Sequence, residues 1–313
     1  MNKKSKIFIA GHNGLVGSAI LKLSKKSGYS NIHTISRSKL DLTDQKKVFK
    51  YLKELKPEGL IIAAAKVGGI NANNIHRAQF IYENLAIQNN LIHGSFLAGV
   101  KNLVFLGSSC IYPKVSKIPI KEKYLLSGEL EYTNEAYAIA KIAGLKLCEN
   151  YNIQYKTNYK CLMPCNIYGP GDNYDLETSH FFPALIHKIH YAKMKGDKFI
   201  NVWGDGSPKR ELLFSEDLAS ACLYFLKRDT RESLINIGSG IELSIKQYAK
   251  FIMKELDIDL KINFDTSKPN GTLRKMIDSS LANKYGWEAK TQLKKGFKIT
   301  YKEYKKKLSL NIC

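Results

Sequence analysis

The chain has 313 residues, 44% of them hydrophobic and 25% charged, which is typical of a folded globular protein and argues against disorder. No apolar run approaches the roughly 18 residues of a membrane-spanning helix. The apolar segment behind the basic start, residues 7–10, is too short for a signal peptide. These features exclude a membrane protein and an exported one, so we expect a cytoplasmic protein without a membrane partner.

Lysine dominates the formal charge of +21, because six of the 49 basic residues are arginines and the other 43 are lysines. Nucleic-acid binding would explain such a charge, but no nucleic-acid-binding motif accompanies it. We therefore interpret it as a solvated surface that also attracts a small anionic ligand, and expect no nucleic-acid partner.

Short apolar runs alternate with longer amphipathic runs through the first half of the chain. They predict strands at 6–10, 31–35, 59–64, 102–106 and 159–163, and helices at 15–26, 44–54, 78–98 and 135–151. The alternation predicts an α/β fold, a Rossmann-type doubly wound parallel sheet with helices on both faces. Ligands of such sheets bind beyond the carboxyl ends of the strands.

The rhythm changes after Gly169-Pro170-Gly171. Helices are predicted at 182–195 and 216–227, strands at 201–203 and 234–237, a loop at 265–272 and a basic helix near the end. We expect residues 1–168, with roughly 212–240, to form one domain around the parallel sheet. Residues of roughly 169–211 and 241–313 are expected to form a smaller C-terminal α/β lobe that binds the substrate.

A glycine motif lies between the first predicted strand and the first predicted helix. Gly11, Gly14 and Gly17 form Gly-x-x-Gly-x-x-Gly, in which glycine lets the backbone approach a pyrophosphate at a helix N-terminus. The predicted dinucleotide site also includes Asn13, Leu15 and Val16 in this turn, Asp41 and Leu42 near the adenine, and Ala63, Ala64 and Ala65, which leave space for a ribose.

Arg37 follows the second predicted strand, where a site for NAD usually has an acidic residue. A guanidinium suits the charge and shape of a 2′-phosphate, although a solvated surface arginine is the simpler interpretation. We therefore expect NADP(H) rather than NAD.

Ser108 follows the fourth predicted strand, and Tyr137 and Lys141 lie four residues apart on the next helix. This spacing places both side chains on one helical face. A cation about 4 Å from the phenol is worth up to ~4 kcal/mol at intermediate dielectric, so we expect Lys141 to lower the pKa of Tyr137. Tyr137 would then donate or accept a proton near neutral pH.

These motifs, in this order, resemble the extended short-chain dehydrogenase/reductases, and within them the GDP-L-fucose synthase family. The resemblance covers nearly the whole chain, and its most specific segments are Lys66-Val67-Gly68-Gly69 and Ser109-Cys110-Ile111-Tyr112. It implies NADPH-dependent reduction at C4 of a GDP-linked 4-keto-6-deoxy sugar. Ser108 and Tyr137 would bind the C4 oxygen, Lys141 would hold the nicotinamide ribose, and a homodimer is implied.

The resemblance also implies epimerisation at C3 and C5, in which Cys110 removes protons and His180 returns them. A thiol is mostly protonated at pH 7, so we expect a cationic neighbour such as His180 beside Cys110. Further positions carried over for the cofactor are Leu106, Gly107, Pro164, Asn166, Ile167 and His180. Those carried over for the substrate are Ser109, Cys110, Asn166, Lys188, Trp203, Arg210 and Asn270.

Several positions depart from the family pattern. Asn13 and Lys188 replace arginines, Cys165 replaces threonine and Asn270 replaces aspartate. These changes put the identity of the sugar in doubt more than the reaction. The alternative is a C4 reductase that acts on a related GDP-4-keto-6-deoxy sugar, such as a heptose, and leaves epimerisation to another enzyme.

Two alternatives from other classes are ranked lower, an NADP-sensing regulator without activity and a basic nucleic-acid-binding protein. The presence of both Tyr137 and Lys141 argues against the regulator. No metal is expected, because His187 and His190 lack further ligand residues and are interpreted as solvated helix positions. The six cysteines show no paired spacing, so most are expected to be reduced core residues.

Overall fold

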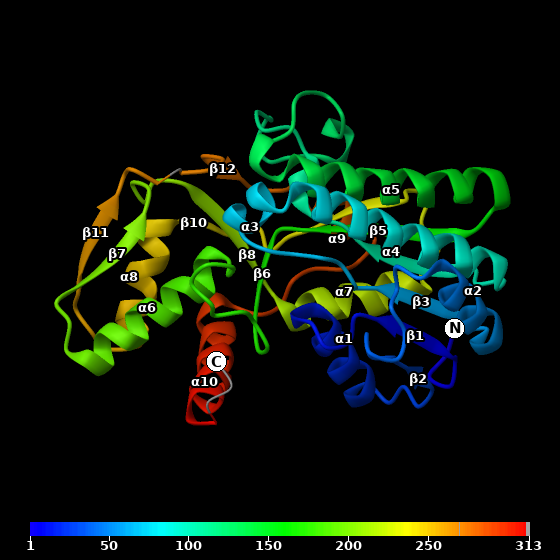
Figure 1. The fold of residues 1–313 in the computed structure, drawn as a ribbon, viewed down its shortest axis with the longest axis horizontal. Coiled ribbons are helices and arrows are strands. Elements are labelled where there is room, and N and C mark those ends of the chain that lie inside the picture. Colours follow the sequence, from blue (N-terminus) through cyan, green and yellow to red (C-terminus); the bar gives the residue numbers. More distant parts are fainter. Residues whose placement is uncertain (269, 311–313) are drawn as a thin grey trace.

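The computed structural model describes residues 1–268 and 270–310, so Pro269 of the family pattern and Cys313 lie outside the described residues. A large domain and a smaller lobe lie next to each other (Figure 1). The large domain contains a six-stranded parallel sheet in the order β2-β1-β3-β4-β5-β9. Its strands are β1 (Ile7–Ala10), β2 (Ile32–His33), β3 (Gly59–Ile62), β4 (Asn102–Leu106), β5 (Asn158–Pro164) and β9 (Leu234–Ile237).

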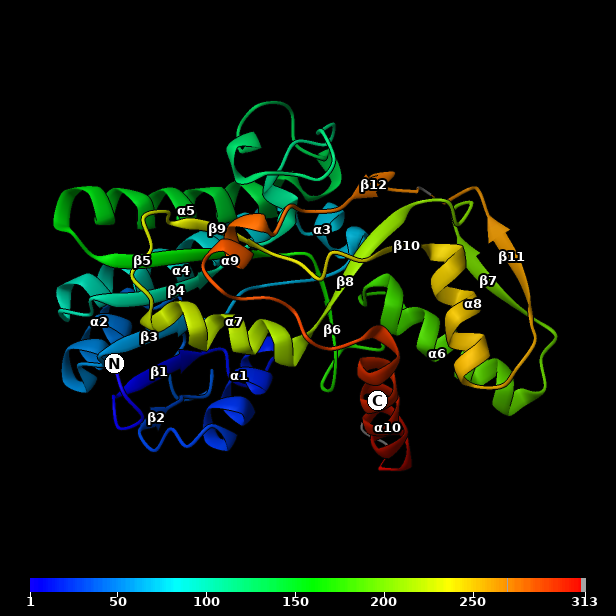
Figure 2. The same cartoon turned by 180° about the vertical axis from the view of Figure 1, so that it is seen from behind.

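Helices cover both faces of this sheet, as predicted. Helices α1 (Leu15–Lys26) and α7 (Ser215–Lys227) pack together on one face (Figure 2). The other face carries α2 (Gln45–Leu55), α4 (Arg77–Leu97) and α5 (Glu135–Tyr155). Strands β1, β3 and β4 are almost wholly buried because both faces are covered, which explains their continuous apolar sequences. The doubly wound fold is thereby confirmed.

The strand order creates a crevice for a ligand. From β1 the chain crosses to β2 on one side and returns to β3 on the other, so the connections diverge at the carboxyl end of β1. Ligands of open α/β sheets bind at such a switch point. The glycine motif lies there.

The smaller lobe contains two small sheets. One joins β10 (Glu242–Ser244), β8 (Lys209–Phe214) and β12 (Arg274–Lys275), with β6 (Asn166–Tyr168) also paired to β8. The other pairs β7 (Phe199–Trp203) with β11 (Lys261–Asp265). Helices α6 (Phe181–Lys195), α8 (Ile245–Glu255) and α10 (Leu293–Ser309) enclose a second core around Phe182, Tyr248 and Phe297.

Short elements complete the described part of the chain: α3 (Ile70–Ile75), α9 (Ser280–Lys284) and the 3-10 turns η1 (Ser109–Ile111), η2 (Glu122–Tyr124) and η3 (Tyr132–Asn134). The predicted domain division stays a prediction. Ile277, Ala282 and Trp287 pack against the first core, although the predicted ranges assign them to the lobe.

Most predicted elements are present, with shifted ends. β2 has two residues instead of the predicted five, and β3 ends two residues early at Ile62, before the chain turns to the ligand crevice. Helix α5 continues four residues past the predicted end, and left-handed Lys156 follows it. β6, β8, β10, β11, β12 and α8 were not predicted. The strands are short and mixed in polarity, so they lack a clear period. Within residues 1–268 and 270–310, no helix is both long and apolar enough to cross a membrane.

Candidate active site

Two of the three motif glycines are required by the fold of the turn itself. Gly11 has a positive φ of 89°, and a Cβ there would lie 2.5 Å from the backbone nitrogen of Ala64. A Cβ on Gly17 would lie 1.9 Å from the carbonyl oxygen of Gly11. Gly11 and Gly17 therefore bring β1, β3 and α1 into contact.

Gly14 is different, because nothing within the protein requires a glycine there. Its backbone is extended (φ −78°, ψ 168°), and a Cβ would meet only the Gly11 oxygen at 3.6 Å. It precedes α1, whose first turn has neither a side-chain cap nor an acidic residue. An exposed glycine before uncapped backbone N–H groups fits an approaching diphosphate, so this turn fits the predicted dinucleotide.

Buried asparagines of α4 hold the rest of the predicted cofactor site. Asn90 Nδ2 donates to the carbonyls of Leu42 and Thr43, both at 3.0 Å. Asn84 exchanges two 3.0 Å hydrogen bonds with the backbone of Lys66, just after half-buried Ala63, Ala64 and Ala65. These contacts fix both loops at the carboxyl edge of the sheet.

Arg37 reaches into solvent beside this edge. Its guanidinium lies 4.0 Å from Glu83, whose carboxylate also accepts from Lys66 Nζ at 2.8 Å. Asp41 caps its own turn, since its carboxylate accepts from the nitrogen and hydroxyl of Thr43 at 2.9 and 2.8 Å. These hydrogen bonds lower the pKa of Asp41. Arg37 is thus available to a phosphate, whereas the Asp41 carboxylate is already bound.

Ser108 and Cys110 follow β4 in one turn. The Ser108 hydroxyl accepts from the backbone nitrogen of Cys110 at 3.4 Å and so caps η1. Ser109 and Cys110 are buried while Ser108 is half-buried. The turn therefore presents the hydroxyl of Ser108 at the carboxyl end of β4.

Tyr137 and Lys141 share one face of α5, as predicted. Lys141 is buried and its ammonium donates to the Leu106 carbonyl at 2.8 Å, 5.6 Å from the centre of the Tyr137 ring. Burial lowers the pKa of Lys141 to about 8. The predicted lowering of the Tyr137 pKa is wrong for this structure, because burial raises it and Cys110 raises it further.

Burial raises the pKa of the Cys110 thiol, and Lys275 of β12 opposes that rise more than the Ser108 hydrogen bond or Lys141 does. Sequence reasoning did not name Lys275 as a cation that acts on Cys110. The role expected of His180 toward Cys110 stays a prediction.

His180 is brought from the lobe toward the domain by paired loops. The Gly69 nitrogen donates to the Thr178 carbonyl at 3.0 Å, and a Cβ on Gly69 would lie 2.9 Å from the Ser179 oxygen. His180 then caps α6 with extended backbone and no side-chain cap bond. The residue is exposed, and desolvation by the surrounding protein lowers its pKa.

The predicted substrate residues lie on different elements of the lobe. Lys188 Nζ donates to the Asn201 carbonyl at 2.9 Å, and burial lowers its pKa. Trp203 ends β7 with its side chain 46% exposed, and Lys268 Nζ lies 5.5 Å from its ring centre. Half-buried Arg210 on β8 has its pKa lowered by burial.

Asn270 has a structural role beside any contact with substrate. Its Oδ1 accepts from the Asp205 nitrogen at 2.9 Å and closes the turn at Gly204. The next residue, Gly271, lies over Arg210, since a Cβ there would be 3.5 Å from the guanidinium. The loop that carries Asn270 and Gly271 therefore lies next to Arg210.

The remaining predicted positions lie at strand ends. Leu106 ends β4, and Gly107, which follows it, donates to the Leu162 carbonyl at 3.0 Å. Pro164 ends β5, and Asn166 and Ile167 begin β6. Their roles toward a cofactor stay predictions.

Comparison with known proteins decides the family. The model of the NAD dependent epimerase/dehydratase family matches residues 7–238. The chain belongs to this family. It is 49% identical to the GDP-L-fucose synthase of Sinorhizobium fredii over 299 residues, covering 96% of this chain and 95% of the relative.

Solved structures are similar to this chain over nearly their whole length. A Campylobacter jejuni GDP-6-OMe-4-keto-L-xylo-heptose reductase has a TM-score of 0.93 and 39% identity, covering 98% of this chain and 99% of that one. A GDP-mannoheptose C4 reductase from Campylobacter jejuni with NADP bound has a TM-score of 0.89 and 40% identity. The match covers 97% of this chain and 99% of that one. The predicted family resemblance is confirmed.

Sequence reasoning missed two residues, Lys275 and Glu211. The Lys275 charge acts on the pKa of Cys110. The buried Glu211 carboxylate accepts from the backbone nitrogens of Gly240 and Ile277 at 2.7 and 3.1 Å. Neither residue carries a local motif. The register of β12 on β8, which opposes Lys275 to Arg210, is the signal that identifies Lys275.

The histidines of α6 were also misjudged. His187 and His190 are half-buried and form hydrogen bonds with Tyr304 and Tyr301 of α10, because α10 packs on this face of α6. Among the described residues no group of His, Cys, Asp or Glu could hold a metal. The five described cysteines are free and buried, as expected.

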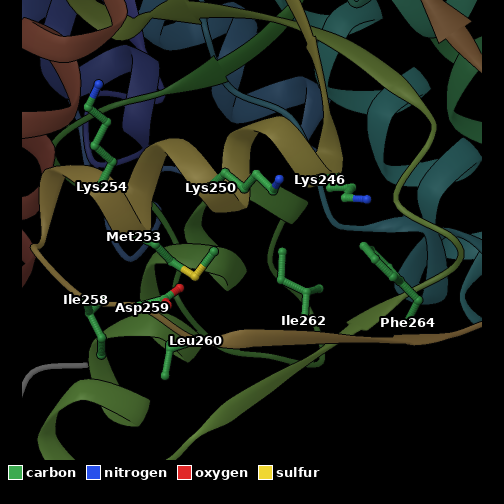
Figure 3. A pocket seen from close by; sticks show the side chains of 9 residues that line it. All are labelled: Lys246, Lys250, Met253, Lys254, Ile258, Asp259, Leu260, Ile262 and Phe264. Atoms are coloured by element: carbon green, nitrogen blue, oxygen red, sulfur yellow. The ribbon is translucent and has the colours of Figure 1, made fainter.

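A surface hollow of about 430 Å³ lies away from this site, between α8 and β11 (Figure 3). Lys246, Lys250 and Lys254 line one side, and Leu260, Ile262 and Phe264 line the other. Its lining includes one carboxylate, Asp259, and no tyrosine, histidine or cysteine. It therefore lacks side chains of the kinds that Ser108, Tyr137 and Cys110 bring together at the end of β4.

Proposed function

We propose that this protein is an NADPH-dependent reductase that acts at C4 of a GDP-linked 4-keto-6-deoxy sugar and also epimerises C3 and C5. The observation that carries the proposal is the placement of Ser108, Tyr137 and Lys141 together at the carboxyl end of β4, beside a turn whose Gly14 fits a dinucleotide. The similarity to GDP-L-fucose synthases and to an NADP-bound C4 reductase supports the cofactor and the substrate class.

For the reduction, the hydroxyls of Ser108 and Tyr137 donate hydrogen bonds to the C4 oxygen. The raised pKa of Tyr137 keeps the phenol protonated near neutral pH, so it serves as the acid that gives the oxygen its proton. Gly14 and Arg37 would hold NADPH, which would supply the hydride when bound. Lys141, fixed on the Leu106 carbonyl, would also bind the nicotinamide ribose.

For the epimerisation, the C4 carbonyl makes the protons on its two neighbouring carbons acidic. The Cys110 thiolate removes such a proton, the hydroxyls of Ser108 and Tyr137 stabilise charge on the C4 oxygen, and His180 returns a proton from the other face. The lowered pKa of His180 makes its imidazolium a stronger acid, although less of it forms at neutral pH.

The substrate's diphosphate and nucleoside would bind in the lobe. Lys188 and Arg210 supply positive charge, and Trp203 supplies an exposed ring that can stack on a base. Ser109, Asn166 and Asn270 border this region and stay predictions as substrate contacts.

The names of two similar solved structures support a second candidate function. Two solved relatives with TM-scores of 0.93 and 0.89 have names that describe a heptose reductase and a heptose C4 reductase. This favours a C4 reductase for a GDP-4-keto-6-deoxy heptose as the alternative, with epimerisation done elsewhere.

The test is incubation with GDP-4-keto-6-deoxymannose and NADPH in heavy water, followed by NMR of the product. Deuterium at C3 and C5 together with reduction is the expected result. Reduction without deuterium identifies a C4 reductase, and no NADPH oxidation with this sugar or its heptose analogue overturns the proposed reaction. Cys110→Ser should abolish the label and spare hydride transfer to a substrate that is already epimerised.

We further propose that the protein is cytoplasmic, because NADPH and reduced thiols belong to that compartment. We also propose that it forms a homodimer. Helices α4 and α5 pack side by side and expose Tyr82, Leu97 and Ile153, each more than half exposed. Light scattering should give the mass of a dimer, and Ile153→Glu with Tyr82→Glu should give that of a monomer. A monomer for the unmodified chain would contradict the proposal.

A further inference from the structure

The carboxylate of Glu83 on α4 lies between two cations near the predicted cofactor site. Its Oε1 accepts from Lys66 Nζ at 2.8 Å, and its Oε2 lies 4.0 Å from the guanidinium of Arg37. Lys66 follows β3 and Arg37 follows β2, and these two strands flank β1 in the sheet. Glu83 therefore connects the loops on both sides of the strand that ends in the glycine turn.

The Lys66 side of this arrangement is fixed, whereas the Arg37 side is open. Asn84 holds the backbone of Lys66 through two 3.0 Å hydrogen bonds, and Lys66 Nζ lies 5.9 Å from the ring centre of buried Phe80. The side chains of Lys66 and Glu83 are 29% and 22% exposed, whereas that of Arg37 is 80% exposed. The Glu83 carboxylate is thus held in place by Lys66, and its ion pair with exposed Arg37 contributes little.

A phosphate that binds to Arg37 also meets the negative charge of Glu83. Arg37 is the predicted contact of the 2′-phosphate, and Asn13 in the glycine turn adds no charge. Since Glu83 lies 4.0 Å from the guanidinium, a phosphate bound there is within about 10 Å of the carboxylate, the range over which charges interact at 0.1 M salt. Lys66 offsets part of the resulting repulsion. The weak pairing with Arg37 does not, so the carboxylate acts against the phosphate.

We propose that Glu83 is a specificity-determining residue that lowers the preference of this protein for NADPH over NADH. The two cofactors differ in the 2′-phosphate, so a charge beside Arg37 acts on the binding of one and not of the other. The inference rests on the role of Arg37 toward NADPH in the proposed function. It is independent of the sugar and of the epimerisation, so the test needs no sugar.

The experiment measures the binding of NADP⁺ and NAD⁺ by isothermal titration calorimetry. Glu83→Gln keeps the shape of the side chain and should bind NADP⁺ about three- to tenfold more tightly, because one unit charge a few ångströms from a doubly charged phosphate changes affinity by about that much. Binding of NAD⁺ should stay within about twofold. Lys66→Met leaves the carboxylate without its partner and should weaken binding of NADP⁺ instead. Glu54→Gln, on α2 with a side chain that is 65% exposed, is the matched control and should change neither affinity.

The ratio of the NADP⁺ and NAD⁺ affinities decides the outcome. A ratio that rises in Glu83→Gln, with a gain that shrinks at about 500 mM sodium chloride, supports the proposal because salt screens the repulsion. An unchanged ratio overturns it. Weaker binding of NADP⁺ in Glu83→Gln also overturns it, by showing that Glu83 holds Arg37 in place for the phosphate.

Arg37→Met distinguishes a failure of this inference from a failure of the proposed role of Arg37. This variant should lose most of its binding of NADP⁺ and retain its binding of NAD⁺, because a guanidinium suits the charge and shape of a phosphate. If Arg37→Met binds NADP⁺ as tightly as the unmodified protein, Arg37 does not contact the 2′-phosphate. That result would overturn the role of Arg37 and, with it, the role of Glu83.

Discussion

Burial decides the protonation state of the catalytic side chains. From spacing alone, Lys141 should lower the pKa of Tyr137, since two charges about 4 Å apart interact by about 4 kcal/mol at intermediate dielectric. In the structure Lys141 Nζ turns to the Leu106 carbonyl, and the desolvated phenol has a raised pKa. Tyr137 is therefore a protonated donor at neutral pH.

Replacement of Tyr137 by phenylalanine tests this role. We expect kcat for reduction to fall by about 10²- to 10⁴-fold, the usual contribution of a positioned general acid. NADPH affinity and thermal stability should change little, because the ring still packs edge-on against Phe80. Stopped-flow oxidation of NADPH measures the rate, and Tyr82→Phe on the surface of α4 is the matched control. A rate within threefold of the unmodified protein would remove Tyr137 from the reaction.

Lys160 in β5 is a buried cation outside the site. Its side chain is 1% exposed, and burial lowers its pKa from the ordinary 10.5 to about 8, with Asp229 opposing the change. Between these values the unfolded chain binds more protons, so this lysine favours folding more as pH rises from 8 to 10.5. Its protonation below pH 8 costs folding up to about 3 kcal/mol.

Lys160→Met should therefore raise the free energy of unfolding at pH 7 by about 1–3 kcal/mol. The advantage should shrink as pH rises through the range from 8 to 10.5, because the lysine of the unmodified protein then becomes neutral. Urea denaturation at pH 7 and pH 9.5 measures both values. The exposed lysine Lys156 offers the control Lys156→Met. A gain that persists undiminished at pH 9.5 would contradict the electrostatic explanation.

At the scale of elements, the turn between β1 and α1 separates folding from binding. Gly11 and Gly17 are needed for contact among β1, β3 and α1, whereas Gly14 has no neighbour that excludes a side chain. The same motif therefore contains two glycines that the fold requires and one that it does not, which is the one proposed to face the cofactor.

The substitutions Gly11→Ala and Gly14→Ala form a matched pair. Gly11→Ala should destabilise the protein by about 1–3 kcal/mol, because its φ is positive and its Cβ would meet the Ala64 backbone. Gly14→Ala should leave stability within about 0.5 kcal/mol and weaken NADPH binding at least about tenfold. Thermal unfolding and fluorescence titration measure the two effects. If Gly14→Ala binds NADPH normally, the diphosphate does not lie on this turn.

At the scale of the whole molecule, the candidate site takes its residues from a domain that fits a dinucleotide and from a lobe rich in lysine. Cys110 and Ser108 come from the domain, while His180, Arg210 and Lys275 come from the lobe. The charge of +21 attracts anions over a range that salt shortens, to about 10 Å at 0.1 M.

Added salt should therefore weaken binding of the substrate more than it slows the chemical step. Between about 50 and 500 mM sodium chloride we expect KM for the GDP-linked sugar to rise several-fold while kcat stays within about twofold. Steady-state kinetics measures both, with sodium glutamate as a check on ion identity. A fall in kcat with constant KM would show that the charges of the site act on catalysis and not on capture.

The sequence alone was sufficient for the parallel sheet, the glycine turn and the shared face of Tyr137 and Lys141. Each depends on neighbours within a few residues, since strand and helix periods and the 3.6-residue turn fix local geometry. It was insufficient for β8, β10 and β12, whose partners lie far away in the chain. The pairing of His187 and His190 with tyrosines of α10 was hidden for the same reason.

By itself, then, the order of residues determined which chemical groups the protein carries, and on which strand ends and helix faces they lie. Only the tertiary structure decided which of them meet and in what protonation state. Lys275 is one of 43 lysines until the register of β12 places it beside Arg210 and near Cys110. The physical reason is that pKa depends on desolvation and on charges brought together from the domain and the lobe, and both are set by packing between distant segments.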